Sequence, residues 1–400
     1  MRSPRPMDTA WQRTGAPQSR RKHENLILGL LRKHGPLTRG ELGERCGLSR
    51  TTLYDVVGAL MDSGAVSASV PRVGGRGRGR PAEKLSSNPW AADLLGIDFA
   101  RQAVRVAAMT TVHGSISSAS EPHGPDASWE ERLDVARRLT RALTGGTLRL
   151  DTLSGVGVGV TGPVGPLEDD SPGAIHPETV SALVSESFGI PARLDSNTRL
   201  ATLAERTWGA AIDEQDVLYL SLSHSVGGGL VVGGTLHRGA HGLSGQFGHI
   251  TVDPGGEPCA CGRVGCLETV ASIGAVLDAH GSAADVPQLV AALEAGDRAA
   301  HSVLERAGTH VGRVLADLCN AFGPSVVVLG GELTGTGPAL MNPLRRELDA
   351  NVACRGSRMP LHVRPAKLGD VGAALGALAL LLHRQSAATG RPVPLAPAVP

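Results

Sequence analysis

Apolar residues near the start of the chain recur with helical spacing. Ile27, Leu30 and Leu31 form one apolar face and predict a first helix. A second face has the spacing i, i+3, i+4 and i+7 and consists of Leu53, Val56, Val57 and Leu60. The pattern therefore predicts a small helical bundle between residues 24 and 70.

Polar residues mark the helix ends in this region. Thr38 and Glu41 have the spacing of a capping box, which opens a short helix ending near Cys46. Gly47 follows as a turn, and Ser49 is placed to cap the next helix. Two helices joined by a three-residue turn have the spacing of a helix-turn-helix. The chain from residue 65 to residue 85 then predicts two short strands around a loop, which adds a wing.

Strand-like runs alternate with helix-like runs beyond Leu94, which predicts an α/β architecture. The clearest strands are residues 94–98, 154–160, 217–223 and 325–331. The chain is therefore divided into a disordered basic arm at 1–23, a winged helix-turn-helix domain at 24–85, a linker at 86–92, an α/β body at 93–383, and a disordered tail at 384–400.

The charge of the chain is unevenly distributed. Residues 1–85 hold 16 Lys and Arg against 7 Asp and Glu, a net charge of +9, whereas the remaining residues hold 23 against 31, a net charge of −8. A basic head on an acidic body indicates that the head meets a polyanion such as double-stranded DNA. A solvated basic tail is the alternative.

Hydropathy places the chain away from membranes. No apolar run reaches the roughly 18 residues that a bilayer span requires, and the N-terminus has no apolar stretch typical of a secretory signal. We expect a cytoplasmic protein without a membrane partner. In that reducing compartment the six cysteines favour free thiols or metal ligands over structural disulfides.

The third helix and the wing hold the candidate DNA contacts. On the exposed face of the helix these are Arg50, Thr51, Thr52 and Tyr54, whose side chains suit phosphates and base edges in a major groove. In the wing they are Arg76, Arg78 and Arg80, whose intervening glycines allow close approach to a narrow minor groove. The alternatives are a helical bundle that does not bind DNA and a flexible basic linker.

Four potential metal ligands lie within eighteen residues: His249, Cys259, Cys261 and Cys266. Three thiolates and one imidazole form a closed tetrahedral set for Zn²⁺, so the segment 249–266 predicts a structural zinc knuckle. A closed set leaves no position for a water nucleophile. The alternative is incidental cysteines, as we expect for Cys46, Cys319 and Cys354.

The segment from Arg238 to Glu268 closely resembles the ROK family of repressors and sugar kinases, and the resemblance extends from about Leu94 to about Leu382. The fused helix-turn-helix is similar to the repressor branch. The resemblance implies a two-lobed, actin-like α/β domain around a cleft that binds a sugar or sugar phosphate. It also implies a homodimer or homotetramer.

The resemblance also implies the residues of the sugar cleft. Asp195 matches the family's catalytic base, although the Asn that usually precedes the base is Leu194 here. Gln246 and His249 match the family's ExGH motif, with an amide in place of the carboxylate, and Glu268 matches a sugar-contacting Glu. Asp195, Gln246, His249 and Glu268 are therefore the candidate ligand-binding residues.

The family's two phosphate loops are altered. The first, of the form DxGGT, is matched by Asp98 to Gln102, where the glycines are missing. The second, of the form GTGxGGG, is matched by residues 223–229 and keeps only its last glycines, while Gly330 and Gly331 are retained after a later strand. Because phosphoryl transfer depends on positioning and charge neutralisation, the chain is expected not to be an enzyme, with Asp195 as a vestigial base.

Three functions remain open at this stage. The first is a sequence-specific transcriptional regulator, a repressor by resemblance, whose kinase-like domain binds a sugar effector and mediates oligomerisation. The second is an active sugar kinase that carries a regulatory head. The third is a regulator that works without a ligand because its sugar cleft has degenerated.

Overall fold

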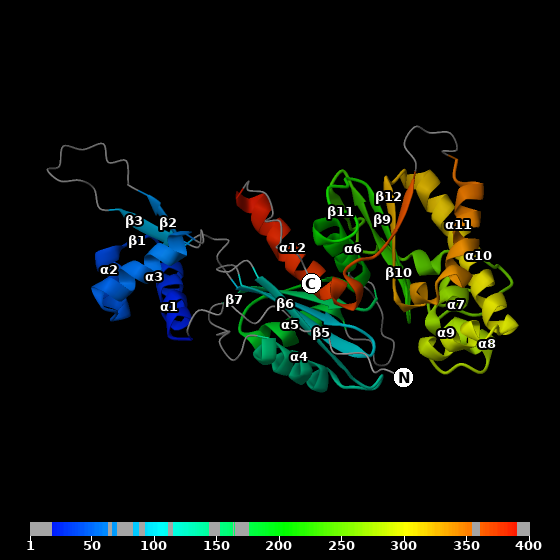
Figure 1. The fold of residues 1–400 in the computed structure, drawn as a ribbon, viewed down its shortest axis with the longest axis horizontal. Helices are drawn as coiled ribbons and strands as arrows, with labels where there is room; N and C mark the ends of the chain where they lie inside the picture. The colour runs from blue at the N-terminus through cyan, green and yellow to red at the C-terminus, as the bar shows by residue number, and fades with distance from the viewer. Residues whose placement is uncertain are drawn as a thin grey trace, which may run out of the picture. The chain divides into compact units, whose positions relative to one another are not determined.

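A computed structural model describes residues 18–62, 66–69, 83–87, 93–110, 115–143, 153–162, 164, 176–353 and 361–389. The chain forms two compact units, one made mainly of residues 1–93 and one made mainly of the chain from Leu94 onward. Figure 1 shows the elements of each unit, and each is described by itself.

The first unit, here called the head, combines three helices with a small sheet. The helices are α1 (Gln18–His34), α2 (Arg39–Cys46) and α3 (Arg50–Asp62), and the strands are β1 (Leu37–Thr38), β2 (Val66–Ser69) and β3 (Lys84–Ser87). The sheet order is β1-β3-β2, with both neighbours antiparallel to β3. This is a winged helix-turn-helix, as the hydrophobic pattern predicted.

Local polar contacts set the helix boundaries of the head. The Thr38 hydroxyl accepts from the Glu41 amide and the Glu41 carboxylate accepts from the Thr38 amide, so the capping box is confirmed. Gly47 adopts φ 65°, the left-handed conformation that glycine tolerates at a helix end. The Ser49 hydroxyl accepts from the Thr52 amide at 3.2 Å and caps α3. The apolar face of α3 is buried as expected.

Three of the expected segment boundaries were wrong. Helix α1 begins at Gln18, inside the expected arm, because residues 18–23 contain no helix breaker and Arg20 pairs with Glu24 one turn on. Strand β3 takes in two residues of the expected linker, because Ser87 pairs with Val66 through the backbone. The last helix reaches Thr389 because residues 384–389 contain Arg, Gln and two Ala, which favour helix, and no Gly or Pro. Residues 1–17, 88–92 and 390–400 lie outside the described residues.

The second unit, here called the body, contains two five-stranded sheets with the same strand order. The first sheet has the order β6-β5-β4-β7-β8 and the second β11-β10-β9-β12-β13. The first-sheet strands are β4 (Asp93–Phe99), β5 (Ala103–Thr110), β6 (Ser115–Pro122), β7 (Leu153–Val160) and β8 (Ala192–Ser196). The second-sheet strands are β9 (Val217–Leu222), β10 (Val226–Val232), β11 (Thr235–His237), β12 (Val326–Gly330) and β13 (His362–Pro365). The four clearest strands expected from the sequence are all present, and the repeated order confirms a two-lobed α/β body.

The body contains nine α-helices within the described residues. They are α4 (Trp129–Leu143), α5 (Pro177–Phe188), α6 (Asn197–Trp208), α7 (Glu268–Ala271), α8 (Ile273–His280), α9 (Val286–Glu294), α10 (Arg298–Phe322), α11 (Pro338–Asn351) and α12 (Gly372–Thr389). Short 3₁₀ turns lie at Phe247–His249, Glu332–Thr336 and Gly369–Val371. Helices α7 to α11 lie with the second sheet in Figure 1.

Helix α12 packs unusually close to its neighbours. A Cβ added at Gly96 of β4 would lie 2.0 Å from the Ala374 carbonyl, and one at Gly157 of β7 would lie 2.3 Å from the Ala377 carbonyl. One at Gly376 would lie 1.8 Å from the Leu200 carbonyl of α6. The glycines therefore let α12 lie directly on the first sheet and on α6.

Membrane insertion finds no support among the described helices. None of them combines the length and apolar character that a bilayer crossing requires.

Candidate functional sites

Helix α3 presents a polar face to solvent. Arg50, Thr51 and Tyr54 are exposed, and Tyr54 has 48% of its surface accessible. Thr52 is half-buried, and its hydroxyl lies 2.8 Å from that of Ser49, so its polar atom is shared with the cap. Three of the four expected contact residues on this helix are therefore free to reach a partner, while Thr52 is partly committed to the fold.

The structure adds one basic residue to this face that the sequence pattern did not identify. The Arg39 guanidinium lies 5.4 Å from the centre of the Tyr54 ring, and that of Arg50 lies 5.8 Å from it. Arg39 also pairs with Glu83, just before β3, and so ties α2 to the wing strand. Because Arg39 directly follows the capping Thr38, it is the first residue of α2, and that position could have been recognised from the sequence. Arg76, Arg78 and Arg80 lie outside the described residues.

The four predicted metal ligands meet in space. The ligand atoms of His249, Cys259, Cys261 and Cys266 all lie within 4.8 Å of one another. The Cys259 sulfur lies 3.5 Å from His249 Nδ1, and the sulfurs of Cys261 and Cys266 are 3.6 Å apart. Those separations are too long for a disulfide but fit the edges of a tetrahedron with Zn–S bonds of about 2.3 Å. The donor set therefore fits a bound metal ion.

A short, tightly turned loop holds these ligands. Gly265 has φ 69°, and a Cβ there would lie 1.5 Å from the Asp253 carbonyl, so the turn requires glycine. The Arg263 side chain donates to the His249 carbonyl at 2.6 Å. The Arg263 amide lowers the pKa of the Cys261 thiol to about 6, whereas burial raises that of Cys266 to about 12. The exposed Cys261 is thus the easier thiolate, and a metal cation would stabilise the buried one.

Three of the expected sugar-binding residues surround the start of β10. The Glu268 carboxylate accepts from the Val226 amide at 2.8 Å. Gly248, between Gln246 and His249 in the chain, packs against the Val226 carbonyl, 2.1 Å from where a Cβ would stand. Gln246 is half-buried at the start of the Phe247–His249 turn. The fold therefore gathers Gln246, His249 and Glu268, but Asp195 belongs to a different set of contacts.

A cavity of about 530 Å³ lies between the two sheets and is here called the cleft. Both altered phosphate loops line it, through Ala100 to Gln102 on one side and Ser223 to Ser225 on the other, with Gly330 and Gly331 beside them. Its charged lining residues include Asp98, Arg101, Arg105, Glu332 and Asp370. Both signs are present, so the cleft offers no strongly basic cradle for a triphosphate.

Asp98 lies buried at the wall of the cleft. Its Oδ2 accepts from Arg105 at 3.1 Å, while Oδ1 is buried and has no partner among the described residues. Burial raises the pKa of Asp98 to about 6, although Arg105 acts in the opposite direction. The carboxylate that the family uses at its first phosphate loop is therefore engaged by an arginine from the neighbouring strand.

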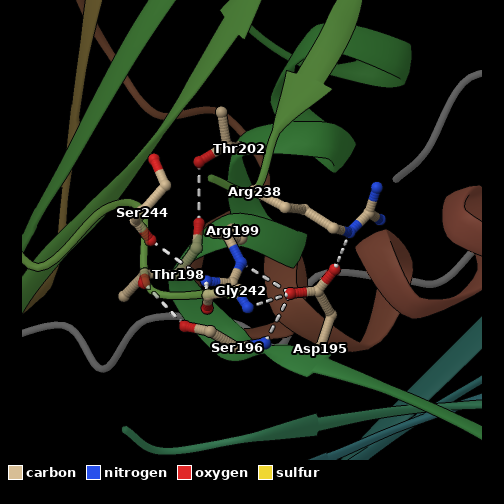
Figure 2. A network of polar contacts seen from close by, with 8 residues as sticks. All are labelled: Asp195, Ser196, Thr198, Arg199, Thr202, Arg238, Gly242 and Ser244. Carbon is tan, nitrogen blue, oxygen red and sulfur yellow. Dashed lines mark hydrogen bonds and ion pairs between the residues drawn. The ribbon is translucent and has the colours of Figure 1, made fainter. Parts of the chain in front are cut away.

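Asp195 lies in a buried ion-pair network where β8 meets α6. Figure 2 shows it held by two arginines: Arg199 Nε donates to Oδ1 at 2.6 Å, and Arg238 Nε donates to Oδ2 at 2.8 Å. Asp195 is 2% exposed and Arg199 is 1% exposed, so this is a buried ion pair. Both carboxylate oxygens of Asp195 are occupied and Asp195 does not line the cleft, so its contact with a ligand stays a prediction.

The residue at the β8–α6 junction that does face the cleft is Asn197. Its Nδ2 donates at 3.5 Å to the hydroxyl of Thr161, which directly follows β7. An amide carries no basic lone pair for taking a substrate proton. Asn197 lies two positions after Asp195, and the match of Asp195 to the family's base stays a prediction.

Comparisons with known proteins agree with these features. Residues 94–384 match the ROK family, and residues 20–67 match a winged helix-turn-helix DNA-binding family. The chain is 24% identical over 376 residues to the xylose repressor of Bacillus subtilis, covering 90% of this chain and 94% of that protein.

Two further relatives show both branches of this similarity. The chain is 28% identical over 380 residues to NagC, a DNA-binding transcriptional dual regulator of Escherichia coli, covering 89% of this chain and 91% of NagC. It is also 30% identical to the solved ROK hexokinase from Thermus thermophilus, with a TM-score of 0.59, over 74% of this chain and 99% of that one. The xylose repressor and NagC thus cover about nine tenths of this chain, whereas the kinase covers about three quarters of it.

Proposed function

Because this chain belongs to the ROK family and carries a winged helix-turn-helix head, we propose that it is a DNA-binding transcriptional repressor with a kinase-like body that senses an effector. The observation that carries the proposal is the head itself. Helix α3 buries its apolar face and turns Arg50, Thr51 and Tyr54 outward, with Arg39 beside them. The named repressors among its relatives align along nearly the whole chain.

The experiment is operator binding by the full-length protein. Genomic footprinting identifies the bound sites, and fluorescence anisotropy then measures affinity for one of them. Arg50→Ala should weaken operator binding at least about tenfold, since a base-edge contact contributes about 1–3 kcal/mol. Arg345→Ala, an exposed arginine on the body helix α11, is the matched control and should bind normally. Equal affinity of all three proteins for the operator would exclude α3 as the recognition helix.

The wing arginines have a different expected role. Arg78→Ala and Arg80→Ala should weaken binding and reduce the slope of log affinity against log salt by about 0.9 for each lost phosphate contact. Arg50→Ala should instead reduce the preference for the operator over unrelated DNA, with little change in the salt dependence of binding. Unchanged salt slopes would exclude the wing from the DNA interface.

The body is proposed to bind without catalysing phosphoryl transfer. Asp195 is paired with two arginines, and Asp98 is engaged by Arg105. The side chains of Arg101 and Ser223 stand in loops that line the cleft, at positions where the family's phosphate-loop motifs have glycine. A coupled ADP-release assay over a panel of sugars should therefore detect no turnover. A rate of about 1 s⁻¹, at the low end for ordinary enzymes, would instead establish the alternative of an active kinase.

The proposed effector is a sugar or sugar-like molecule held by Gln246, His249 and Glu268. These residues gather at the start of β10, and the relatives include a xylose repressor and an N-acetylglucosamine repressor. A true effector at a hundredfold its Kd should stabilise the protein by about 2.7 kcal/mol in a thermal-shift series. Glu268→Gln should abolish that shift. If no sugar stabilises the protein, a regulator with a ligand-free cleft is the better description, which the occupied Asp195 carboxylate favours.

The knuckle at 249–266 is proposed to hold one structural Zn²⁺ through His249, Cys259, Cys261 and Cys266. The donor set is closed, so the ion would pin the loop that carries Gln246 and Glu268 and supply no reactive water. Elemental analysis should find about one zinc per chain, and Cys259→Ser should lower that content. Retention of full zinc by the variant would exclude this ligand set.

Oligomerisation and cellular location complete the proposal. A cytoplasmic homodimer or homotetramer would present paired heads to a two-fold operator with half-sites about one helical turn apart or a multiple of it. Light scattering of the full-length protein measures the oligomeric state, and the footprint gives the spacing between half-sites. A strictly monomeric protein bound at a single half-site would contradict it.

A further inference from the structure

The body contains a second cavity, of about 740 Å³, which is here called the basic cavity. Its walls come from helices α5, α6 and α12, strand β8 and the turn between β10 and β11. None of the described residues that line the cleft also lines the basic cavity. The two are therefore separate sites, and the function proposed above makes no use of the second one.

One part of the basic cavity is apolar. Ala192, Leu203, Leu236 and Leu380 line it and are all buried, and Leu194 is half-buried beside them. Leu194, at the position where the family usually has Asn, thus contributes apolar surface here. These apolar side chains could contact the carbon skeleton of a ligand without requiring hydrogen bonds from it.

The rest of the lining is cationic. Arg193, Arg238 and Arg384 line the cavity and are exposed, and His383 lines it half-buried. The described lining residues include no Asp or Glu. The chain outside residues 1–85 carries a net charge of −8, so three arginines around one cavity make its local electrostatic potential positive on a unit that is negative as a whole.

A fourth arginine lies behind this surface. The Arg206 guanidinium lies 3.5 Å from where a Cβ of the lining residue Gly234 would stand, and its Nε is buried with no partner among the described residues. Burial and the nearby Arg206 both lower the pKa of His383, whose Nε2 lies 3.2 Å from the Thr207 hydroxyl. The positive potential therefore extends below the surface of the cavity.

The carboxylate that Arg238 contacts does not cancel that charge. Asp195 already binds the buried Arg199 through Oδ1, which leaves Arg238 sharing a carboxylate that another guanidinium has neutralised. Arg238 uses its Nε for this contact, and Figure 2 shows its two terminal nitrogens directed away from Asp195. Those nitrogens are positioned to donate to a ligand. Arg193 and Arg384 have no hydrogen bond or ion pair with any described residue.

We propose that the basic cavity binds a small organic anion, with its phosphate or carboxylate group held by Arg193, Arg238 and Arg384 and its carbon skeleton against Leu203, Leu236 and Leu380. The cavity volume falls within the range of about 300–1,000 Å³ that is usual for small-molecule sites. Guanidinium groups recognise phosphates and carboxylates through paired, charge-assisted hydrogen bonds. The site is distinct from the sugar site at Gln246 and Glu268, so the regulator would respond to an anion as well as to a neutral sugar.

Isothermal titration of the full-length protein tests this, with glucose 6-phosphate and citrate as the probes. Each is titrated at millimolar concentration in the presence of excess glucose, which competes at any neutral-sugar site. The phosphate and carboxylate probes distinguish which anionic group is preferred. The double variant R193Q/R384Q should weaken binding of the preferred probe at least about tenfold, since each charge-assisted hydrogen bond contributes about 1.5–3 kcal/mol.

Two matched variants and one control measurement complete the design. Arg345→Gln removes the same charge from an exposed site on α11 and should leave anion binding unchanged, as should Glu268→Gln in the sugar site. Operator affinity without anion should be equal in R193Q/R384Q and the unaltered protein. The proposal is overturned if neither anion binds, if binding is lost in Glu268→Gln but kept in R193Q/R384Q, or if R193Q/R384Q weakens operator binding, since the arginines would then contact DNA.

Discussion

The cleft and the basic cavity are lined by the same two helices and yet differ in chemistry. Helix α6 contributes Asn197 to the cleft and Leu203 to the basic cavity, and α12 contributes Ala373 to the first and His383 to the second. Acidic and basic residues are mixed around the cleft, whereas the charged residues described around the basic cavity are all basic.

This contrast shows how differently one pair of helices can be furnished with side chains. In the cleft, Asp98 is paired with Arg105, and Asn197 stands at the β8–α6 junction. In the basic cavity, β8, α12 and the residue after β11 contribute Arg193, Arg384 and Arg238, and no described carboxylate in the lining offsets their charge. Binding specificity is therefore decided by side chains on a shared frame.

The largest expected effect comes from Asp195, whose buried ion pair lies close to the basic cavity. Asp195→Asn should destabilise the protein by about 3–5 kcal/mol, because it leaves the Arg199 guanidinium buried without its counter-charge. Urea denaturation followed by circular dichroism measures this. Adding Arg199→Met should recover part of the loss in a double-mutant cycle. If Asp195→Asn is as stable as the unaltered protein, the ion pair does not hold this part of the fold.

Gly376 tests whether the two cavities depend on one close contact. Gly376→Ala places a Cβ where the Leu200 carbonyl lies 1.8 Å away, so α12 must shift from α6 and both cavities should be disturbed. We expect a loss of about 3 kcal/mol of unfolding free energy and weaker binding of the anion in the basic cavity. Gly274→Ala is the control, because its Cβ would meet no atom within 4 Å inside α8. That change should be neutral or stabilise by up to about 1 kcal/mol.

Asp98 tests the cleft alone through pH. Its pKa rises from an ordinary value of 3.8 to about 6 in the folded protein, so the folded state binds the proton more tightly than the unfolded state. Stability from this group is therefore present below pH 4 and is lost as pH rises through 6. Relative to the unaltered protein, Asp98→Asn should gain about 3 kcal/mol between pH 4 and pH 7. Parallel pH profiles of the two proteins in urea melts would contradict this assignment.

The smallest expected effect on stability comes from the exposed arginines of the basic cavity. Arg193→Gln should change the unfolding free energy by less than about 0.5 kcal/mol, because the side chain is exposed and has no partner among the described residues. Thermal melts measure this, and the same variant should lose stabilisation by added glucose 6-phosphate. A large stability loss without ligand would mean that Arg193 supports the fold and would weaken the contrast between the two cavities.

The sequence was most informative where interactions are local. The capping box at Thr38 and Glu41, the apolar face of α3 and the strands of the body all follow from short spacings, and all are present. It was least informative at the ends of segments. Helix α1 begins before the expected boundary and α12 ends after it, because polar residues without Gly or Pro extend a helix as readily as they form a disordered tail.

By itself, the sequence determined the two-domain organisation and the metal-ligand set, because caps, periodic apolar faces and closely spaced cysteines act within a few turns of chain. Only the tertiary structure decided which residues face a ligand. Asp195 is engaged because Arg238, forty-three positions away, reaches its second oxygen. The basic cavity exists because α12 brings Arg384 next to β8 and Arg193. Such contacts depend on how distant segments pack, so the spacing of residues along the chain does not predict them.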